Sequence, residues 1–315
     1  MAGNSKQARL PAPSGEARPE TRLAVVVVNF KSSREIGSYL ANRTTLPAGT
    51  VVYIVDNFSS ADERESCRLL CETWGWHFIA MDVNAGFGAA CNAGADAALA
   101  SGSSHILLLN PDAAIEAGSI AVLLERSTAT PSAIVAPQVV REGDGSVWFS
   151  GGVLGLGKGY AFHSPAGVDH MDADWLTGAC MLLTAETWMA LEGFDESYFL
   201  YWEDVDLTYR WKRLGGKLIV EHTALASHAV GGTQGAAKLG KSPLYAYQNL
   251  ANRGRFARKN LTAARRFWWF CVTPLYMWKI YKMRGQTARR PYLSAVLRGM
   301  LVGSGLLLGR ESRRA

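Results

Sequence analysis

Short apolar runs that alternate with helical patterns constrain the fold of this 315-residue chain more than any other feature. Four of these runs predict buried strands, because they are brief, rich in Val, Ile and Leu, and followed by polar residues. The predicted strands cover residues 23–30, 50–56, 77–82 and 105–110, and the helical patterns cover 33–41, 62–74 and 86–100. This alternation is typical of an α/β fold with right-handed crossovers, a mostly parallel central sheet and helices on both faces. After about residue 130 the sequence indicates strands only weakly.

Charge divides the chain into unequal parts. Residues 236–315 hold 17 of the 33 Lys and Arg residues and a single acid, Glu311. Residues 1–20 are rich in Pro, Ala, Ser and charge, which favours disorder and is not the pattern of a signal peptide. We therefore expect a disordered segment at 1–20, an α/β domain at 21–235 and a basic α-helical extension at 236–315. Five scattered cysteines predict reduced thiols, as in a cytoplasmic protein.

The extension combines its positive charge with aromatic residues. The apolar run at 267–278 contains Pro274 and is too short to span a bilayer, and the longer run at 292–308 contains Arg298. Aromatic side chains beside basic ones favour an in-plane contact with an anionic membrane surface. The alternatives are a helical subdomain packed on the core and an oligomer interface, and we expect no nucleic-acid partner.

Each of the four predicted strands ends in polar residues. They are Asn29, then Asp56 with Asn57, then Asp82 with Asn84, and finally Asn110 with Asp112. In a parallel sheet these ends emerge along one edge, which is where open α/β sheets bind their ligands. Asn and Asp also favour turns after strands, but four such endings in succession predict a ligand-binding edge.

A glycine-containing segment follows the third predicted strand. Asn84, Gly86, Phe87 and Gly88, with Asn92 beyond them, resemble a phosphate loop that opens a helix, where free backbone N–H groups face a diphosphate. A dinucleotide-binding chain would carry such glycines after its first strand, where this sequence reads Val-Val-Asn-Phe-Lys. The pattern therefore disfavours a nucleotide-binding oxidoreductase.

Two further positions indicate a metal site. Asp112 follows the fourth strand in the sequence Asn-Pro-Asp, where a carboxylate can hold a divalent cation against a diphosphate. The alternative is that Asp112 caps the next helix. His228 follows a strand-like segment at 217–221, and a single His is more often structural than a ligand.

Three acids cluster later in the chain. Glu203, Asp204 and Asp206 precede an apolar helical face and lie at a predicted helix start, where the dipole stabilises carboxylates. The aromatic run at 198–202 leads directly into them, and apolar neighbours raise a carboxyl pKa towards the range of a general base. Simple charge capping of the helix is the alternative.

Taken together, these segments resemble the inverting family 2 glycosyltransferases of the GT-A fold, nearest the rhamnosyltransferase-like branch. The resemblance runs from about residue 24 to residue 233, with weaker similarity at 245–259. It rests on an ordered set of motifs: Val-Val-Val-Asn-Phe, Val-Asp-Asn-Phe-Ser-Ser, Asn-Ala-Gly-Phe-Gly-Ala-Ala-Cys-Asn-Ala-Gly, Leu-Leu-Asn-Pro-Asp, Leu-Thr-Gly-Ala-Cys-Met-Leu, Gly-Phe-Asp-Glu-Ser-Tyr-Phe and Tyr-Trp-Glu-Asp-Val-Asp-Leu. Their order and spacing specify the family better than any single motif does.

The resemblance implies a role for each candidate residue. Asp204 would be the catalytic base. Residues that orient the acceptor or support its loop would be Glu203, Asp206, Trp202, Thr177 and Gly178. The donor would be bound by Asn29, Asp56, Asn57, Asn84, Gly86, Phe87, Gly88, Asn92 and Asn110, with Asp56 on the nucleobase. Asp112 and His228 would hold Mg²⁺ or Mn²⁺. Asn110 replaces the first Asp of the family's D-x-D motif, so the metal would have fewer carboxylate ligands.

The resemblance also implies the reaction. An acceptor hydroxyl, deprotonated by Asp204, would attack the anomeric carbon opposite the leaving nucleoside diphosphate and invert its configuration. The branch favours dTDP-L-rhamnose as the donor, with UDP-hexose or UDP-galactofuranose as alternatives. A catalytically inactive membrane-bound scaffold is the competing hypothesis. The acceptor would be a glycan or a lipid-linked intermediate, and the enzyme would lie on the cytoplasmic face of the plasma membrane.

Overall fold

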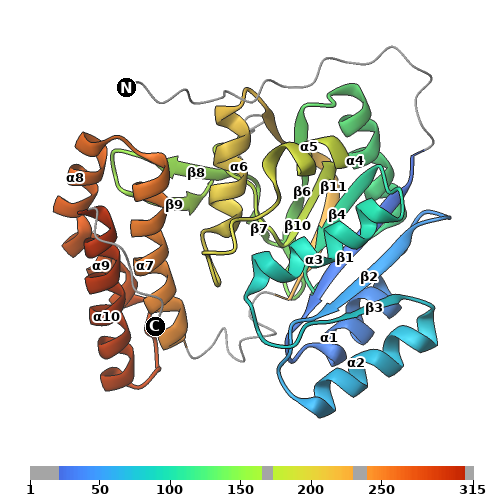
Figure 1. Cartoon of the computed structure of the whole chain (residues 1–315), viewed down its shortest axis with the longest axis horizontal. Coiled ribbons are helices and arrows are strands. Elements are labelled where there is room, and N and C mark those ends of the chain that lie inside the picture. Colours follow the sequence, from blue (N-terminus) through green and yellow to red (C-terminus); the bar gives the residue numbers. More distant parts are fainter. Residues whose placement is uncertain (1–20, 165–172, 230–239, 309–315) are drawn as a thin grey trace.

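A computed structural model describes residues 21–164, 173–229 and 240–308 of the chain. Its main feature is a nine-stranded sheet with the order β3-β2-β1-β4-β10-β6-β11-β5, in which β7 pairs with β6 (Figure 1). The predicted N-terminal segment 1–20 and the predicted boundary at residue 235 lie outside the described residues.

The first half of the sheet agrees with the sequence prediction. Four parallel strands are interleaved with helices, in the order β1 Leu23–Asn29, α1 Ser33–Ile36 with a π-helical turn at Gly37–Ala41, β2 Val51–Asp56, α2 Ala61–Trp74, β3 His77–Ala80, α3 Phe87–Ala100 and β4 His105–Leu109. β1 and β4 are almost completely buried, which is why they read as continuous apolar runs. The α/β class and the mostly parallel sheet are therefore confirmed.

The second half of the sheet contains antiparallel strands. The elements are β5 Ala113–Ile115, α4 Ala117–Ala129, β6 Ala133–Arg141, β7 Val147–Phe149, β10 Cys180–Thr184, α5 Ala185–Leu191, α6 Glu203–Arg213 and β11 Lys217–His228. β10, β5 and β7 run antiparallel to their neighbours, whereas β6 and β11 are parallel. The register of β11 shifts between Glu221 and Leu225, so the strand-like segment predicted at 217–221 is only its first part.

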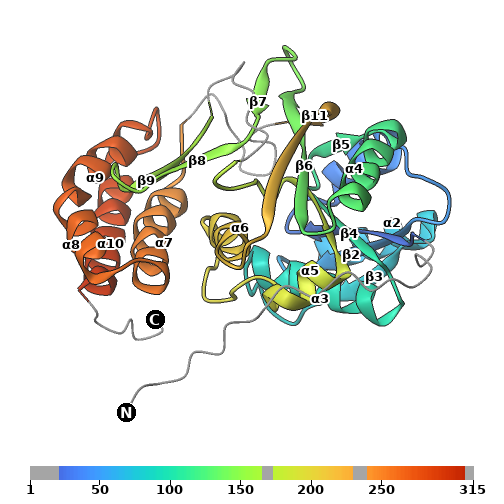
Figure 2. The ribbon, with the colours of Figure 1, turned by 90° about the horizontal axis from the view of Figure 1, so that it is seen from above.

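The C-terminal extension forms a helical layer beside the sheet (Figures 1 and 2). Its helices are α7 Pro243–Asn260, α8 Ala263–Cys271, α9 Thr273–Lys282 and α10 Arg289–Leu307. α7 and α10 cross closely, because a Cβ on Gly254 would lie 2.3 Å from the carbonyl oxygen of Gly303. Within the described ranges, no helix combines the length and the apolar character needed to cross a membrane.

The extension packs on the body of the protein. A small hairpin, β8 Gly152–Gly155 with β9 Tyr160–His163, reaches from the body towards the helices (Figure 2). Trp202, just before α6, packs against Phe256 of α7 and Trp269 of α8. The buried guanidinium of Arg253 in α7 donates a hydrogen bond to the carbonyl of Gly159, which lies between β8 and β9. The helices therefore form a subdomain packed on the core, which leaves only their outer face exposed.

Candidate active site

The ends of β1 and β2 place two predicted donor-binding residues side by side. Asn29 and Asp56 are register partners, and Asn29 Nδ2 donates to Asp56 Oδ1 at 3.1 Å. Arg64 Nε donates to Asp56 Oδ2 at 2.7 Å, so both oxygens of this fully buried carboxylate are engaged. Arg64 therefore lies beside the carboxylate that would contact a nucleobase, and that contact stays a prediction. The guanidinium of Arg64 also lies over the Phe58 ring. The sequence prediction missed Arg64, although the place of Arg64 in the first turn of the helix after Asp56 is a usable signal.

Asn57 holds the loop that follows β3. Its Oδ1 accepts a hydrogen bond from the backbone N–H of Ala85 at 2.9 Å, and its Nδ2 donates to Asn84 Oδ1 at 3.0 Å. Asn84 Oδ1 also accepts from the N–H of Gly86 at 3.1 Å. Asn57 and Asn84 therefore shape the turn into α3 at the predicted ligand-binding edge.

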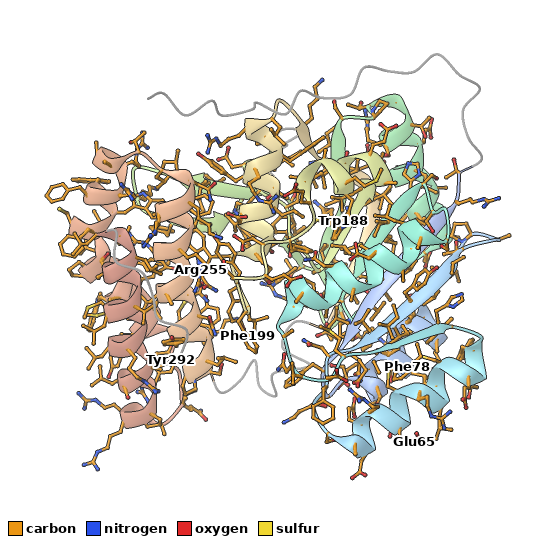
Figure 3. The ribbon with its side chains drawn as sticks, in the orientation of Figure 1. Glu65, Phe78, Trp188, Phe199, Arg255 and Tyr292 are labelled. Carbon is orange, nitrogen blue, oxygen red and sulfur yellow. The ribbon has the colours of Figure 1, made fainter. Side chains whose placement is uncertain are left out.

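The glycines of this loop are required by a neighbouring segment. Gly86 has φ +96°, and a Cβ there would lie 2.4 Å from the carbonyl oxygen of Phe199, which is labelled in Figure 3. A Cβ on Gly88 would lie 2.9 Å from the Cβ of Phe194. The N–H of Phe87 donates to the carbonyl of Phe199 at 3.1 Å, so it is not free for a diphosphate. The phosphate-loop interpretation is thus wrong for this N–H, and both glycines allow close chain packing.

Asn92 has a supporting position instead of the predicted donor contact. Its Nδ2 donates to the carbonyl of Phe194 at 3.0 Å, and its Oδ1 accepts from the N–H of the same residue at 2.8 Å. Gly193 has φ +65°, and a Cβ there would lie 2.5 Å from Asn92 Oδ1. Because both ends of the amide are used, Asn92 fixes the segment that leads towards α6.

The predicted metal-binding residues meet where β4, β5 and β11 end. His228 is the register partner of Ala113, and its Nε2 lies 3.1 Å from Asp112 Oδ1. Asn110 Nδ2 lies 3.3 Å from the same nitrogen. Asp112 and His228 are both nearly buried. Asp112 does not cap a helix, since α4 begins only at Ala117.

The Asp112–His228 pair fits one side of a divalent cation. Mg²⁺ takes octahedral ligands at about 2.1 Å, so two adjacent ligands are about 3.0 Å apart, close to the observed spacing. The described ranges contain no group of three or more His, Cys, Asp or Glu side chains that could hold a metal. The remaining ligands would have to be donor oxygens and water. The His228 ring stacks on Trp148 with 4.7 Å between centroids, a support that the sequence prediction missed.

Asp204 lies across the segment around Gly178 from this pair. Asp204 Oδ2 accepts a hydrogen bond from the N–H of Gly178 at 3.2 Å. A Cβ on Gly178 would lie 3.1 Å from the Phe87 ring and 3.8 Å from the Asp204 Cβ, so a side chain there would crowd both. The next carbonyl, that of Ala179, accepts the N–H of Asn110 at 2.8 Å. One short segment therefore links the predicted base to the end of β4.

Burial changes the acidity of two neighbouring carboxyls. It raises the pKa of Asp204 to about 6, although the hydrogen bonds from the backbone of Gly178 and Val205 oppose this. Burial, followed by the charge of Asp204, raises the pKa of Glu203 well above its usual range. Glu203 Oε2 is buried without a hydrogen-bond partner among the described residues. Burial therefore favours the uncharged form of both carboxyls, and the charge of Asp204 adds to this effect at Glu203.

Asp206 accepts three hydrogen bonds that hold the start of α6 against neighbouring segments. Its Oδ1 accepts hydrogen bonds from Tyr198 Oη at 3.2 Å and Asn260 Nδ2 at 2.8 Å, and its Oδ2 accepts from Arg210 Nε at 2.8 Å. Asp206 is 1% exposed, so of its two predicted roles the structure favours bracing over contact with an acceptor. Thr177 is also nearly buried, and its Oγ1 accepts from the backbone two residues on.

A strained turn immediately precedes the acidic cluster. Tyr201 and Trp202 have φ of +68° and +75°, an unfavourable conformation for residues other than glycine. Asn252 of α7 holds this turn, because its Nδ2 donates to the carbonyls of Leu200 at 2.9 Å and Tyr201 at 2.8 Å. Trp202 is 4% exposed and supports the turn from within the core. The sequence gives no signal for Asn252, which lies in the basic extension.

Comparison with known proteins identifies the family. The family model described as "Glycosyltransferase like family 2" matches residues 19–254, about three quarters of the chain. The chain belongs to this family. The match includes both strand-end clusters, the acidic cluster and most of α7, so a family 2 glycosyltransferase domain contains every predicted site residue.

The similar proteins include characterised transferases. Over 202 residues the chain is 29% identical to the low-salt glycan biosynthesis hexosyltransferase Agl10 of Haloferax volcanii, covering 61% of this chain and 62% of that protein. Over 128 residues it is 30% identical to the N-acetylglucosaminyl-diphospho-decaprenol L-rhamnosyltransferase of Mycobacterium tuberculosis, covering 35% and 42%. The chain thus spans less than two thirds of the length of either relative.

A solved structure supports the GT-A assignment. The mannosyltransferase PcManGT of Pyrobaculum calidifontis, solved with GDP-Man and Mn²⁺, superposes with a TM-score of 0.56 at 14% identity. The superposition covers 96% of this chain and 91% of that one. At this identity the likeness establishes the fold, and the GT-A type prediction is confirmed.

Proposed function

We propose that this chain is an inverting glycosyltransferase that moves a sugar from a nucleoside diphosphate to an acceptor hydroxyl. The observation that carries the proposal is the placement of Asp204, a single ionised carboxylate of raised pKa, across one segment from the Asp112–His228 pair. This arrangement supports the proposal, because a single displacement requires a general base for the acceptor and a separate group that stabilises the leaving diphosphate.

The residues of the chain divide the chemistry between them. Asp204 takes the proton of the acceptor hydroxyl, and the N–H of Gly178 holds Asp204 Oδ2 in place. Glu203 lies beside it, and burial together with the charge of Asp204 favours the uncharged form of Glu203. Asp112 and His228 would hold Mg²⁺ or Mn²⁺, which offsets the negative charge of the leaving diphosphate when bound. Attack opposite the leaving group inverts the anomeric carbon.

The first choice of donor is dTDP-L-rhamnose. The mycobacterial relative is named an L-rhamnosyltransferase, which supports this choice, and the haloarchaeal relative is named a hexosyltransferase, which keeps UDP-hexose and UDP-galactofuranose as alternatives. A catalytically inactive scaffold is disfavoured because Asp204 and Asp112 are both present and positioned.

We place the enzyme on the inner face of the plasma membrane, acting on a glycan or a lipid-linked acceptor. The outer face of the extension exposes at least half of each of four large apolar side chains: Phe267, Trp268, Leu275 and Trp278. These lie in a region with 17 basic residues and one acid. Trp269, which belongs to the same aromatic run, is instead buried, with its Nε1 donating to the carbonyl of Leu156 at 2.8 Å.

The direct test is a donor-hydrolysis and transfer screen of the purified chain across nucleotide sugars, with Mg²⁺, with Mn²⁺ and with EDTA. We expect turnover of one donor, dependent on the cation and lost in Asp204→Asn. Donor binding without turnover of any donor or transfer to any acceptor would support the scaffold hypothesis. Nicotinamide-dinucleotide binding would contradict the family's chemistry altogether.

A further inference from the structure

A cavity of about 430 Å³ lies between the β8–β9 hairpin and helices α8 and α9, and neither the family nor the proposed reaction accounts for it. It is lined by Gly157, Lys158, Tyr160, Trp268, Val272, Leu275, Tyr276 and Lys279. The hairpin supplies the first three of these residues, and the C-terminal extension supplies the other five. Trp268 Nε1 donates to the carbonyl of Gly157 at 2.7 Å, which fixes the hairpin turn against α8.

Two ammonium groups face this cavity. Lys279 Nζ lies 3.6 Å from the centroid of the Tyr160 ring, and Lys158 Nζ lies 5.5 Å from that of Phe162. Burial, followed by the charge of Lys158, lowers the pKa of Lys279, so the two ammoniums repel each other. Neither forms an ion pair with a carboxylate of the described ranges, and residues 240–308 contain no Asp or Glu. Among the described residues, the site therefore holds positive charge without a carboxylate partner, over aromatic walls.

The remaining walls are apolar and open to the surface. Leu275 is 72% exposed and Trp268 is 50% exposed at the rim, whereas Tyr276 is buried at the floor. Tyr276 also makes a side-chain hydrogen bond with Trp202, so the floor adjoins the strained turn before Asp204. An occupant must combine a negative group for the lysines with an apolar chain for the rim.

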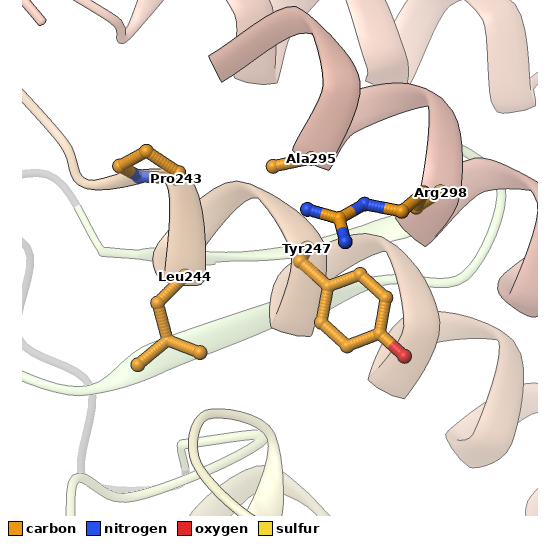
Figure 4. Close-up of a pocket in the computed structure, with 5 residues that line it drawn as sticks. All are labelled: Pro243, Leu244, Tyr247, Ala295 and Arg298. Carbon is orange, nitrogen blue, oxygen red and sulfur yellow. The ribbon is translucent and has the colours of Figure 1, made fainter. Parts of the chain in front are cut away.

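A second cavity shows the contrast. It has a volume of about 270 Å³, lies between α7 and α10, and is lined by Pro243, Leu244, Tyr247, Ala295 and Arg298 (Figure 4). The guanidinium of Arg298 is the only charged group in the lining of this second cavity. Of these two cavities, the hairpin cavity is the one that pairs two bases with an exposed apolar rim.

We propose that the hairpin cavity binds the phosphate of a membrane lipid between Lys158 and Lys279, with the first carbons of its chain against Leu275 and Trp268. The inference rests on the membrane attachment proposed above and makes it specific. It adds Lys158, which lies outside the basic extension, to the attachment site. It also replaces a diffuse attraction between opposite charges with a site for one chemical group, a phosphate carried on an apolar chain.

The test uses the full-length chain and decyl phosphate below its micelle concentration, with tryptophan fluorescence as the readout because Trp268 lines the cavity. We expect saturable one-to-one binding that is at least about tenfold tighter than that of decanol or inorganic phosphate, since each lacks one of the two recognised parts. Lys158→Gln/Lys279→Gln should weaken decyl phosphate binding at least about tenfold, and Leu275→Ser should weaken it less.

The matched control removes two other bases of the same extension. Arg289 and Arg290 are exposed at the start of α10 and line neither cavity, so Arg289→Gln/Arg290→Gln should leave decyl phosphate binding within about twofold. Equal losses in both double variants, or equal binding of inorganic phosphate, would overturn the lipid-phosphate site. Vesicles of phosphatidylcholine with phosphatidic acid should show the same ranking of variants, and equal binding of all variants to these vesicles would also overturn it. Nucleotide-induced stabilisation of each variant tests the transferase proposal separately.

Discussion

Replacing Asp204 with Asn should make the protein more stable while it removes catalysis. Burial raises the pKa of Asp204 from 3.8 to about 6, so the folded state holds this proton more tightly than the unfolded state does. The folded protein therefore loses stability as the pH rises from about 4 to about 6, and the loss persists above that range. At about 1.4 kcal/mol for each pH unit, ionised Asp204 costs about 3 kcal/mol at neutral pH.

The stability assay is thermal unfolding of wild type and Asp204→Asn as a function of pH. The variant avoids the cost of a buried charge but keeps an acceptor for the N–H of Gly178, so we expect a gain of about 1–3 kcal/mol near pH 7.5 that disappears near pH 4. Asp195→Asn is the matched control. Despite some burial, the hydrogen bonds from Lys259 and Ser197 lower the pKa of Asp195, so its removal should destabilise the protein at neutral pH and not at low pH.

The kinetic assay is the pH dependence of transfer. In wild type the rate should rise with unit slope to about pH 6 and then level off, so that the rate near pH 5 is about one tenth of the plateau. Asp204→Asn should lower the plateau by roughly 10²–10⁴-fold with donor binding intact. A variant that is no more stable than wild type at neutral pH and still transfers near its normal rate would refute both the burial argument and the base assignment.

Three further predictions concern neighbouring parts of the molecule. Donor binding measured by calorimetry should weaken in EDTA, and Asp112→Ala should lose most of the cation dependence; equal affinity in EDTA and Mn²⁺ would remove the metal. Asn252→Ala removes two hydrogen bonds to the strained turn, so it should cost about 1–3 kcal/mol in chemical unfolding and lower kcat more than it changes donor affinity. In vesicle sedimentation, Trp268→Ala/Trp278→Ala should reduce binding to anionic vesicles and leave the residual binding more sensitive to salt, and a chain that stays in the supernatant at low salt would contradict membrane attachment.

The first half of the fold could be predicted because its signals are local. β1 and β4 are buried along almost their whole length, so each reads as one apolar run. α2 carries its own boundaries, with Ser60 as N-cap and Gly75 in the left-handed conformation at its C-terminal end. β5 and β7 are three residues long and β11 contains a register shift, so their pairing depends on partners far away in the sequence. Such pairing leaves no periodic pattern to detect.

The candidate site could likewise be predicted only in part from the sequence. The sequence predicted Asp112, His228 and Asp204 as site residues, because strand ends and a helix start are local features. The fold brings Asp112 and His228 together, and Gly178 donates a hydrogen bond to Asp204. The sequence did not show which polar atoms remain free after folding. Both ends of the Asn92 amide form hydrogen bonds with the backbone of Phe194. The spacing of Asn92 from the loop glycines does not reveal this.

The extension has a structural role that its charge alone does not predict. Its bases indicated a surface contact, yet its α7 helix supplies Asn252 to the turn at Tyr201 and Trp202. Left-handed backbone at two residues other than glycine costs about 1–3 kcal/mol for each, so the turn persists only where other contacts compensate. Two hydrogen bonds from Asn252 and the packing of Trp202 on Trp269 provide that compensation. The extension is therefore part of the catalytic unit, and a membrane contact on its outer face would fix the orientation of Asp204 relative to the lipid surface.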